Sequence, residues 1–154
     1  MNIEVAIQRV SNQHGIPTDQ KIRKWVRAAL ADRLADAELT IRIVGEKEGA
    51  ALNEKWRNKD GPTNVLSYPF TENKKLASGP LGDIVICALV IRREAKAQKK
   101  PLESHWAHIV IHGTLHLLGY DHIKTKAAAK MEKLEIKLLN SLGYANPYQD
   151  DDNP

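Results

Sequence analysis

The chain has 154 residues, which is about one domain's worth of sequence. Hydrophobic residues make up 42% and charged residues 27%, an ordinary globular mix that excludes a disordered or fibrous chain. The formal net charge is +4, although three of the 19 acidic residues lie together at 150–152. The rest of the chain is therefore more basic than the whole, which is compatible with a polyanionic partner such as RNA.

The sequence also bears on the compartment in which the protein works. Charged residues or histidines interrupt every apolar run before it reaches the roughly 18–20 residues of a membrane span. The alternating N-terminus does not have the pattern of a secretory signal. Cys87 is the single cysteine, which excludes an internal disulfide and fits a reducing cytosol. We therefore expect a cytoplasmic protein that makes no membrane contact.

Apolar periodicity and turn signals predict alternating strands and helices in the first half of the chain. Residues 3–9 alternate between apolar and polar side chains, as a half-buried strand does. Thr18 or Asp19 can cap a helix with one apolar face. That face consists of Ile22, Trp25, Val26, Ala29 and Leu30. The next elements are expected to be a strand at 39–44, a short helix at 46–58 and a strand at 65–70.

The second half begins with the most apolar segment, 81–89, which we expect to be the central strand. A helix around 90–98 follows, and a longer helix runs from Leu102 to Gly119. The last helix is expected at 124–142. Its outward positions are predicted to be Glu132, Lys133, Glu135 and Lys137. Four strands and about five helices predict one α+β domain over residues 1–149, followed by a frayed acidic tail at 150–154.

The segment HGTLHLLGYDH, residues 112–122, has the clearest chemical signal. His112 and His116 are four residues apart, so a helix projects both from one face. Gly119 lets the chain leave the helix, and His122 follows. Three imidazoles with a fourth position left for water are typical of a catalytic zinc site. The sequence therefore predicts a metal ion held by these three histidines; zinc is expected, and Ni, Co or Fe are alternatives.

This histidine spacing is that of the metzincin zinc proteases, so we expect a metzincin-like metal-binding helix. Those enzymes have a glutamate immediately after the first histidine, where it acts as general base. Gly113 occupies that position here. A metallopeptidase is therefore less favoured. We still expect a metal ion that lowers the pKa of its bound water.

Three residues near the motif have weaker signals. His108 lies one turn before His112 and could orient a metal ligand, as could Asp121 in the turn. We favour a structural or surface role for His105 and His108, and a role in the turn beside glycine for Asp121.

A second cluster, LNEKWRNKDGPTNVLSYPF at 52–70, is basic and then polar. Lys55, Arg57 and Lys59 precede its Gly-Pro turn. A planar guanidinium can hold a phosphate bidentately and neutralise the charge that grows in a phosphoryl transition state. A solvated turn that enters a strand is the alternative interpretation.

These motifs together resemble those of the bacterial YbeY endoribonucleases. The resemblance rests on HGTLHLLGYDH, RNKDGPTNVLSYPF, LGDIVIC and the terminal LGYANPY, and it covers roughly residues 38–148. It implies a compact α+β domain with a small mixed sheet, zinc on the three histidines, and a functional arginine at Arg57. Two positions depart from the family's pattern: Asn64 stands where Asp is usual, and Tyr68 where Phe is usual.

The resemblance also implies a function. The family is implicated in 16S rRNA 3′-end maturation, ribosome biogenesis and ribosome quality control. We therefore expect a metal-dependent, single-strand-specific endoribonuclease in which Arg57 stabilises phosphate charge and Lys55 and Lys59 attract the RNA backbone. The expected partners are ribosomal RNA, the small ribosomal subunit and assembly factors, but no DNA. A non-catalytic, metal-stabilised ribosome-assembly factor is the alternative.

Overall fold

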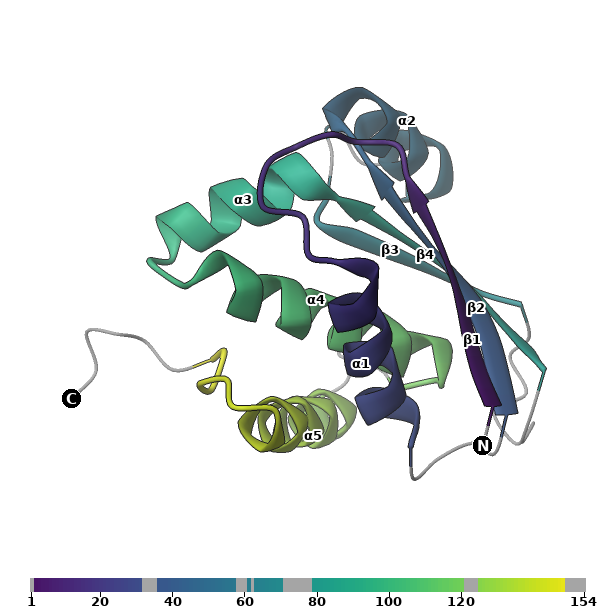
Figure 1. The fold of residues 1–154 in the computed structure, drawn as a ribbon, viewed down its shortest axis with the longest axis vertical. Coiled ribbons are helices and arrows are strands. Elements are labelled where there is room, and N and C mark those ends of the chain that lie inside the picture. The colour runs from purple at the N-terminus through teal and green to yellow at the C-terminus, as the bar shows by residue number, and fades with distance from the viewer. Residues whose placement is uncertain are drawn as a thin grey trace.

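The computed structural model describes residues 2–31, 36–57, 61, 63–70, 79–120 and 125–148, and leaves the side chains of 56 and 57 undescribed. Within these residues the chain forms a four-stranded mixed sheet and five helices, which confirms the predicted α+β class (Figure 1). In chain order the elements are β1 (Asn2–Arg9), α1 (Asp19–Leu30), β2 (Asp36–Val44), α2 (Glu46–Arg57), β3 (Val65–Pro69), β4 (Pro80–Cys87), α3 (Ala88–Ala97), α4 (Leu102–Leu117) and α5 (Thr125–Ser141). None of the described helices is long and apolar enough to cross a membrane.

The strands follow the order β1-β2-β4-β3 across the sheet. β1, β2 and β4 are parallel, and β3 pairs antiparallel with β4. β4 is an inner strand, as its apolar sequence predicted. The strand ends at Cys87, however, so the prediction of strand for Ala88 and Leu89 was wrong, and both belong to α3. A continuous apolar run does not by itself distinguish a buried strand from a buried helix, which explains the error.

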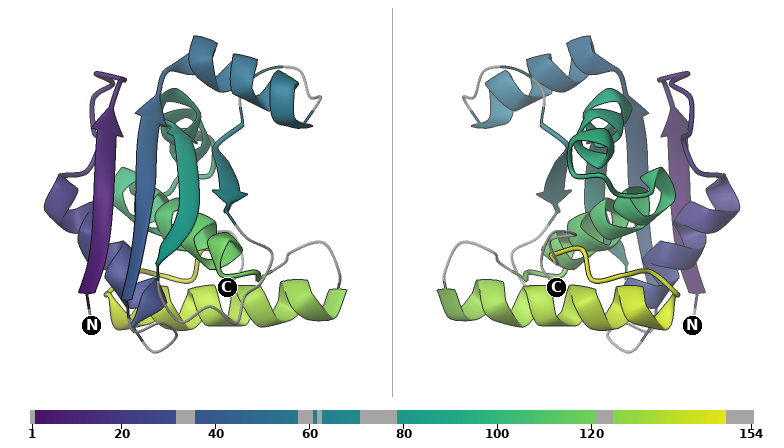
Figure 2. Two further views of the ribbon diagram at one scale, coloured as in Figure 1. Left: turned by 90° about the vertical axis from the view of Figure 1, so that its right-hand side faces the viewer. Right: turned by 90° about the vertical axis from the view of Figure 1, so that its left-hand side faces the viewer.

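Local signals determine α1 as expected. The Thr18 side chain accepts a hydrogen bond from the Lys21 backbone N–H at 3.3 Å and so caps the helix. All five residues of the predicted apolar face are buried. They pack α1 against α4 on one face of the sheet. α5 runs across one end of this helical layer (Figure 2).

α4 is the central helix of the protein. It packs against β3, β4, α1, α3 and α5, and ten of its residues are buried. Gly119, at φ 100°, ends it as predicted. The Gly119 N–H donates to the His116 carbonyl at 3.0 Å and the Tyr120 N–H donates to the Leu115 carbonyl at 3.1 Å, which is a Schellman ending. Polar side chains on so enclosed a helix need partners inside the protein.

α5 corrects one prediction that matters for the site. Glu132, Lys133 and Lys137 are exposed as expected, but the Glu135 side chain is fully buried, at 0% exposure. Glu135 lies four residues after Met131 and three before Leu138, so helical geometry places it on the apolar face. The error came from assigning the side chain by its charge when its spacing pointed inward.

Candidate metal centre

Four histidines follow one another along α4. His105, His108, His112 and His116 are separated by three, four and four residues, so they share one side of the helix. The ring centroids of successive pairs lie 6.3, 5.9 and 4.6 Å apart. The structure thus brings together His112 and His116, as the spacing predicted, and places His108 directly beside them.

His112 contacts a different partner through each ring nitrogen. Its Nε2 lies 3.1 Å from the Nε2 of His116, and its Nδ1 lies 2.7 Å from Oε1 of Glu135. An ionised carboxylate only accepts hydrogen bonds, so in a neutral His112 the proton is on Nδ1. The Nε2 lone pair is then presented on the side of His116, in the tautomer that a metal ligand requires.

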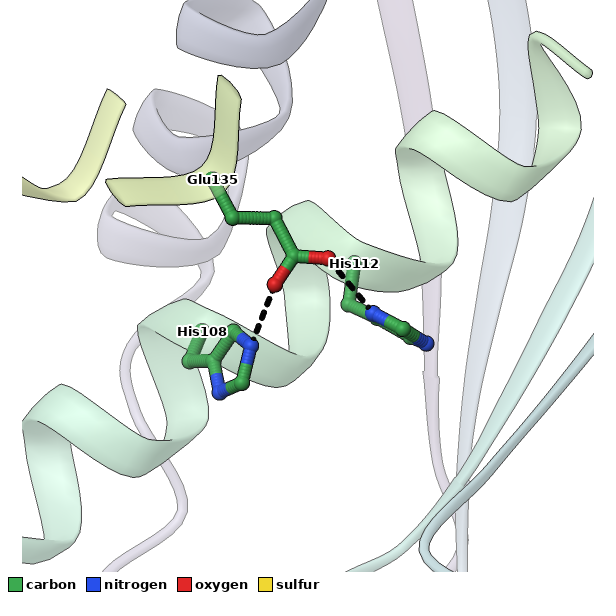
Figure 3. A group of neighbouring side chains, drawn as sticks. All are labelled: His108, His112 and Glu135. Atoms are coloured by element: carbon green, nitrogen blue, oxygen red, sulfur yellow. Dashed lines mark hydrogen bonds and ion pairs between the residues drawn. The ribbon is translucent and has the colours of Figure 1, made fainter. Parts of the chain in front are cut away.

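Glu135 is a buried acceptor for three donors. Figure 3 shows its carboxylate reaching from α5 to His108 and His112 on α4. Oε1 accepts from His112 at 2.7 Å, and Oε2 accepts from His108 Nε2 at 2.6 Å and from the Tyr148 hydroxyl at 2.5 Å. Burial by itself would raise the pKa of Glu135, but the hydrogen bonds from His108 and His112 outweigh it and lower the pKa to about 2. Glu135 is therefore ionised at neutral pH.

The two outer donors hold the protonation states that this arrangement needs. Burial lowers the pKa of His108, although Glu135 opposes the shift, so a neutral His108 donates through Nε2. Burial and the hydrogen bond to Glu135 raise the pKa of the Tyr148 phenol. Each side chain consequently keeps a proton to share with Glu135 at neutral pH.

Among the described residues, His108, His112 and Glu135 form a group that could hold a metal ion, with candidate ligand atoms within 4.8 Å of one another. Their contacts of 2.6 and 2.7 Å have the length of hydrogen bonds. Two ligand atoms of one tetrahedral zinc would lie roughly 3.3 Å apart, given Zn–N distances of about 2.0–2.1 Å. The 3.1 Å between the Nε2 atoms of His112 and His116 is close to that spacing, and it is also the length of a hydrogen bond between two imidazoles. The donor set is therefore compatible with a metal at the Nε2 side of His112, with Glu135 bound at its Nδ1 side.

The region where metzincins have their catalytic glutamate is occupied differently here. Gly113 packs directly against the sheet: a Cβ on it would lie 3.1 Å from Ile84 Cγ2 and 3.3 Å from Val65 Cγ2. The Ser67 hydroxyl also donates to the Gly113 carbonyl at 3.1 Å. A larger side chain at this position would press into β3 and β4. The close packing therefore favours glycine at this position.

Other predicted site residues are only partly described. His122, Asp121 and Lys59 lie outside the described residues, as does the side chain of Arg57. Arg57 is the last residue of α2, and Lys55 is exposed two residues earlier. The roles assigned to all of these residues stay predictions.

Sequence reasoning missed Glu135 and Tyr148. Glu135 had a signal, because its spacing from Met131 and Leu138 places it on the buried face of α5. Tyr148 had no local signal of contact with a histidine, since its partners come from other parts of the chain.

A second histidine–carboxylate pair lies at the other end of α4. His105 is only 4% exposed, and its Nε2 lies 2.9 Å from Oε1 of Glu94 on α3. The Asn64 amide donates to the same oxygen at 3.1 Å. Burial alone would raise the pKa of Glu94, but the hydrogen bonds from His105 and Asn64 lower it below its usual value. An amide suits this position, because an aspartate would place a second carboxylate against Glu94.

A hollow lies between α2 and the sheet, and the described residues that line it include no histidine. Its volume is about 860 Å³, and Arg42, Glu48, Asp83 and Val85 are among the residues that line it. Arg42 donates to both carboxylate oxygens of Glu48, at 2.6 and 3.0 Å, so its charge is already neutralised. Asp83 adds a negative charge. The described part of this hollow therefore does not favour a phosphate backbone.

Fold and centre together define a small α+β protein whose buried central helix holds a histidine–carboxylate centre suited to a metal ion. The family profile described as Endoribonuclease YbeY matches residues 6–143. Endoribonuclease YbeY of Pseudomonas fluorescens is 53% identical over 152 residues, which cover 98% of this chain and 99% of that protein. A solution structure from Thermotoga maritima superposes with a TM-score of 0.60 at 26% identity, covering 96% of this chain and 97% of that one. The chain belongs to the YbeY endoribonuclease family, and the resemblance found in the sequence is confirmed.

Proposed function

We propose that this protein is a metal-dependent endoribonuclease that cleaves single-stranded RNA. The observation that carries the proposal is the 3.1 Å approach of the Nε2 atoms of His112 and His116, with Glu135 bound to the opposite nitrogen of His112. Membership of a family named for endoribonuclease activity supports RNA as the substrate.

In this proposal His112, His116 and His122 hold the metal ion. Three imidazoles suit zinc, with Ni, Co or Fe as alternatives set by availability in the cell. A zinc ion bound there would supply a Lewis acid and a water molecule whose pKa is lowered to about 7. Glu135 keeps His112 in the ligating tautomer, and His108 helps to hold Glu135. Asp121, the residue before His122 in the sequence, is assigned a similar orienting role.

Basic residues at sequence positions 55–59, which begin in the last turn of α2, are proposed to bind the RNA. Arg57 would hold the phosphate at the cleaved bond and stabilise the charge that develops there. Lys55 and Lys59 would attract the backbone less specifically, so binding should weaken steeply with salt. The support for this placement is that the chain passes from Arg57 into β3, where Ser67 contacts α4 at Gly113 beside His112.

We further propose that the substrate is ribosomal RNA in the cytoplasm. The activity would serve 16S rRNA 3′-end maturation, ribosome biogenesis and ribosome quality control. The small ribosomal subunit and its assembly factors would be the partners. Family membership and the net charge of +4 support this assignment.

The first experiment measures metal content by elemental analysis. Wild type and His14→Ala, whose histidine is exposed and on no described helix or strand, should each contain about one zinc per chain, and His116→Ala should contain none. A wild type that takes up no transition metal even after zinc reconstitution would overturn the metal site.

The second experiment measures RNA cleavage by zinc-loaded protein. Arg57→Ala should cleave single-stranded RNA about 100-fold more slowly, the typical cost of losing one donor to transition-state charge, with metal content unchanged. Arg27→Ala, which removes an exposed arginine from α1, should cleave like wild type. The product ends distinguish attack by water, which leaves a 5′-phosphate, from attack by the 2′-hydroxyl, which leaves a 2′,3′-cyclic phosphate. Ribosome binding without cleavage by metal-replete protein would support the non-catalytic assembly factor instead.

A further inference from the structure

The LGYANPY motif, residues 142–148, has no part in the proposed reaction, yet it leads from α5 back to the centre. After α5 the chain reverses at Gly143, at φ 92°. The Tyr144 N–H donates to the Leu139 carbonyl at 2.8 Å, and the Gly143 N–H donates to the Asn140 carbonyl at 3.1 Å. This is the same Schellman ending that terminates α4. It directs the following residues across α4.

Several contacts fix this C-terminal segment, 142–148, in place. The Tyr144 ring meets the Trp25 ring edge-on at 6.2 Å, and its hydroxyl donates to Glu103 at 2.8 Å. The Lys100 ammonium donates to the Pro147 carbonyl. These partners come from α1, α4 and the connection between α3 and α4. Contacts with three parts of the chain therefore fix the residues that precede Tyr148.

Tyr148 is 44% exposed, yet its hydroxyl reaches the buried carboxylate. The hydroxyl donates to Oε2 of Glu135 at 2.5 Å, and the ring meets the His108 ring edge-on at 5.3 Å. The side chain therefore lies between solvent and the oxygen that His108 also contacts. Loss of the hydroxyl would leave Oε2 with His108 as its one described donor.

We propose that Tyr148 is a positioning residue of the metal centre. It holds the Glu135 carboxylate, and Glu135 in turn holds the ring and the tautomer of His112. A carboxylate with three donors on two oxygens has little freedom to rotate, so the Oε1 contact to His112 stays aligned. The LGYANPY motif thereby becomes part of the metal centre, although it supplies no metal ligand. This inference rests on the proposed function, because it requires that His112 binds a metal.

The test compares two tyrosines of the same motif. Tyr148→Phe should weaken zinc binding about tenfold, at the lower end of the 10–100-fold effect of removing a hydrogen-bond partner of a metal ligand. Tyr144→Phe also removes a hydroxyl that binds a glutamate, Glu103, but it leaves the ring packed on Trp25, so it should weaken zinc binding by a clearly smaller factor than Tyr148→Phe does. Zn²⁺ is titrated into the full chain against a chromophoric chelator. Equal effects of the two substitutions would overturn the proposal.

A double-mutant cycle tests whether Tyr148 acts through Glu135. In a Glu135→Gln background, Tyr148→Phe should cause little further loss of zinc affinity, since the group it positions is already gone. The same tenfold loss in both backgrounds would overturn the proposed route. Lys100→Met removes the contact to Pro147 without changing a residue of the centre, so it should weaken zinc binding by a smaller factor than Tyr148→Phe does. This variant is used in the test in place of Tyr148→Phe if Tyr148→Phe does not fold.

The outcomes separate this inference from the proposed function. A wild type that binds no zinc overturns the proposed metal site itself. A wild type that binds zinc, with Tyr148→Phe binding equally well, overturns the positioning role alone.

Discussion

Two of the histidine–carboxylate contacts along α4 look alike when each is viewed alone. His105 meets Glu94 at 2.9 Å near the beginning of the helix, and His112 meets Glu135 at 2.7 Å in its second half. Both carboxylates come from a neighbouring helix, and hydrogen bonds lower both of their pKa values. Local chemistry therefore does not distinguish the two pairs.

The other nitrogen of each histidine does distinguish them. The Nδ1 of His105 is buried and has no hydrogen-bond partner among the described residues. The second nitrogen of His112 instead lies 3.1 Å from His116. A carboxylate that orients an imidazole thus makes a candidate metal centre only where the freed lone pair meets a further ligand. Both pairs join helices, and the second also belongs to the candidate metal centre.

The strongest test of this difference removes each histidine in turn. His112→Ala should abolish zinc binding and slow RNA cleavage by at least about 100-fold, because a metal contributes several kcal/mol of transition-state stabilisation. His105→Ala should retain one zinc per chain. Elemental analysis and a cleavage assay check both variants, and zinc loss from His105→Ala alone would reverse the assignment of the two pairs.

A smaller effect is expected from the carboxylates. Glu135→Gln should weaken zinc binding about 10–100-fold, because His112 loses the acceptor that sets its tautomer. Glu94→Gln should leave the zinc dissociation constant within about twofold. Competition with a chelator measures both constants. Similar losses in the two variants would mean that the pairs do not differ in the way described.

Glu94→Gln should instead affect the fold. The substitution weakens the contacts to His105 and Asn64. We expect the free energy of unfolding to fall by about 1 kcal/mol, which is below the roughly 1.5–3 kcal/mol typical of hydrogen bonds to charged groups because Glu94 is 31% exposed. Urea unfolding of metal-free protein measures this. No change in stability would contradict the view that this pair joins α3 to α4.

The smallest effect is a dependence of stability on pH. The pKa of Glu94 is lower in the folded protein than its ordinary value of 4.5. As the pH falls, Glu94 is therefore protonated in the unfolded chain before it is protonated in the folded protein. Its contribution to the free energy of unfolding is complete above pH 4.5 and is lost as the pH falls through the folded pKa. The difference in unfolding free energy between wild type and Glu94→Gln should narrow over that interval. A difference that stays constant with falling pH would contradict the shift.

The sequence alone determined those features that depend on neighbours along the chain. Thr18 and Gly119 mark helix ends, and the apolar face of α1 follows from periodicity. The four-residue spacing places His112 and His116 on one side of a helix, because 3.6 residues make one turn. These relations hold wherever the helix packs, so they could be predicted without knowing its surroundings.

The hydrogen-bond partner of each histidine on α4 depends on the tertiary structure. Glu135 lies 23 residues after His112, and Tyr148 lies in the C-terminal segment that follows α5. Only the packing of α5 and of this segment on α4 brings the three residues together. Charge suggested that Glu135 faces solvent, but the burial of α5 places it among the donors that stabilise its charge. Spacing along a helix sets direction, whereas contact between distant segments depends on how the whole core packs. Tertiary packing therefore distinguishes the candidate metal centre from the similar pair at His105.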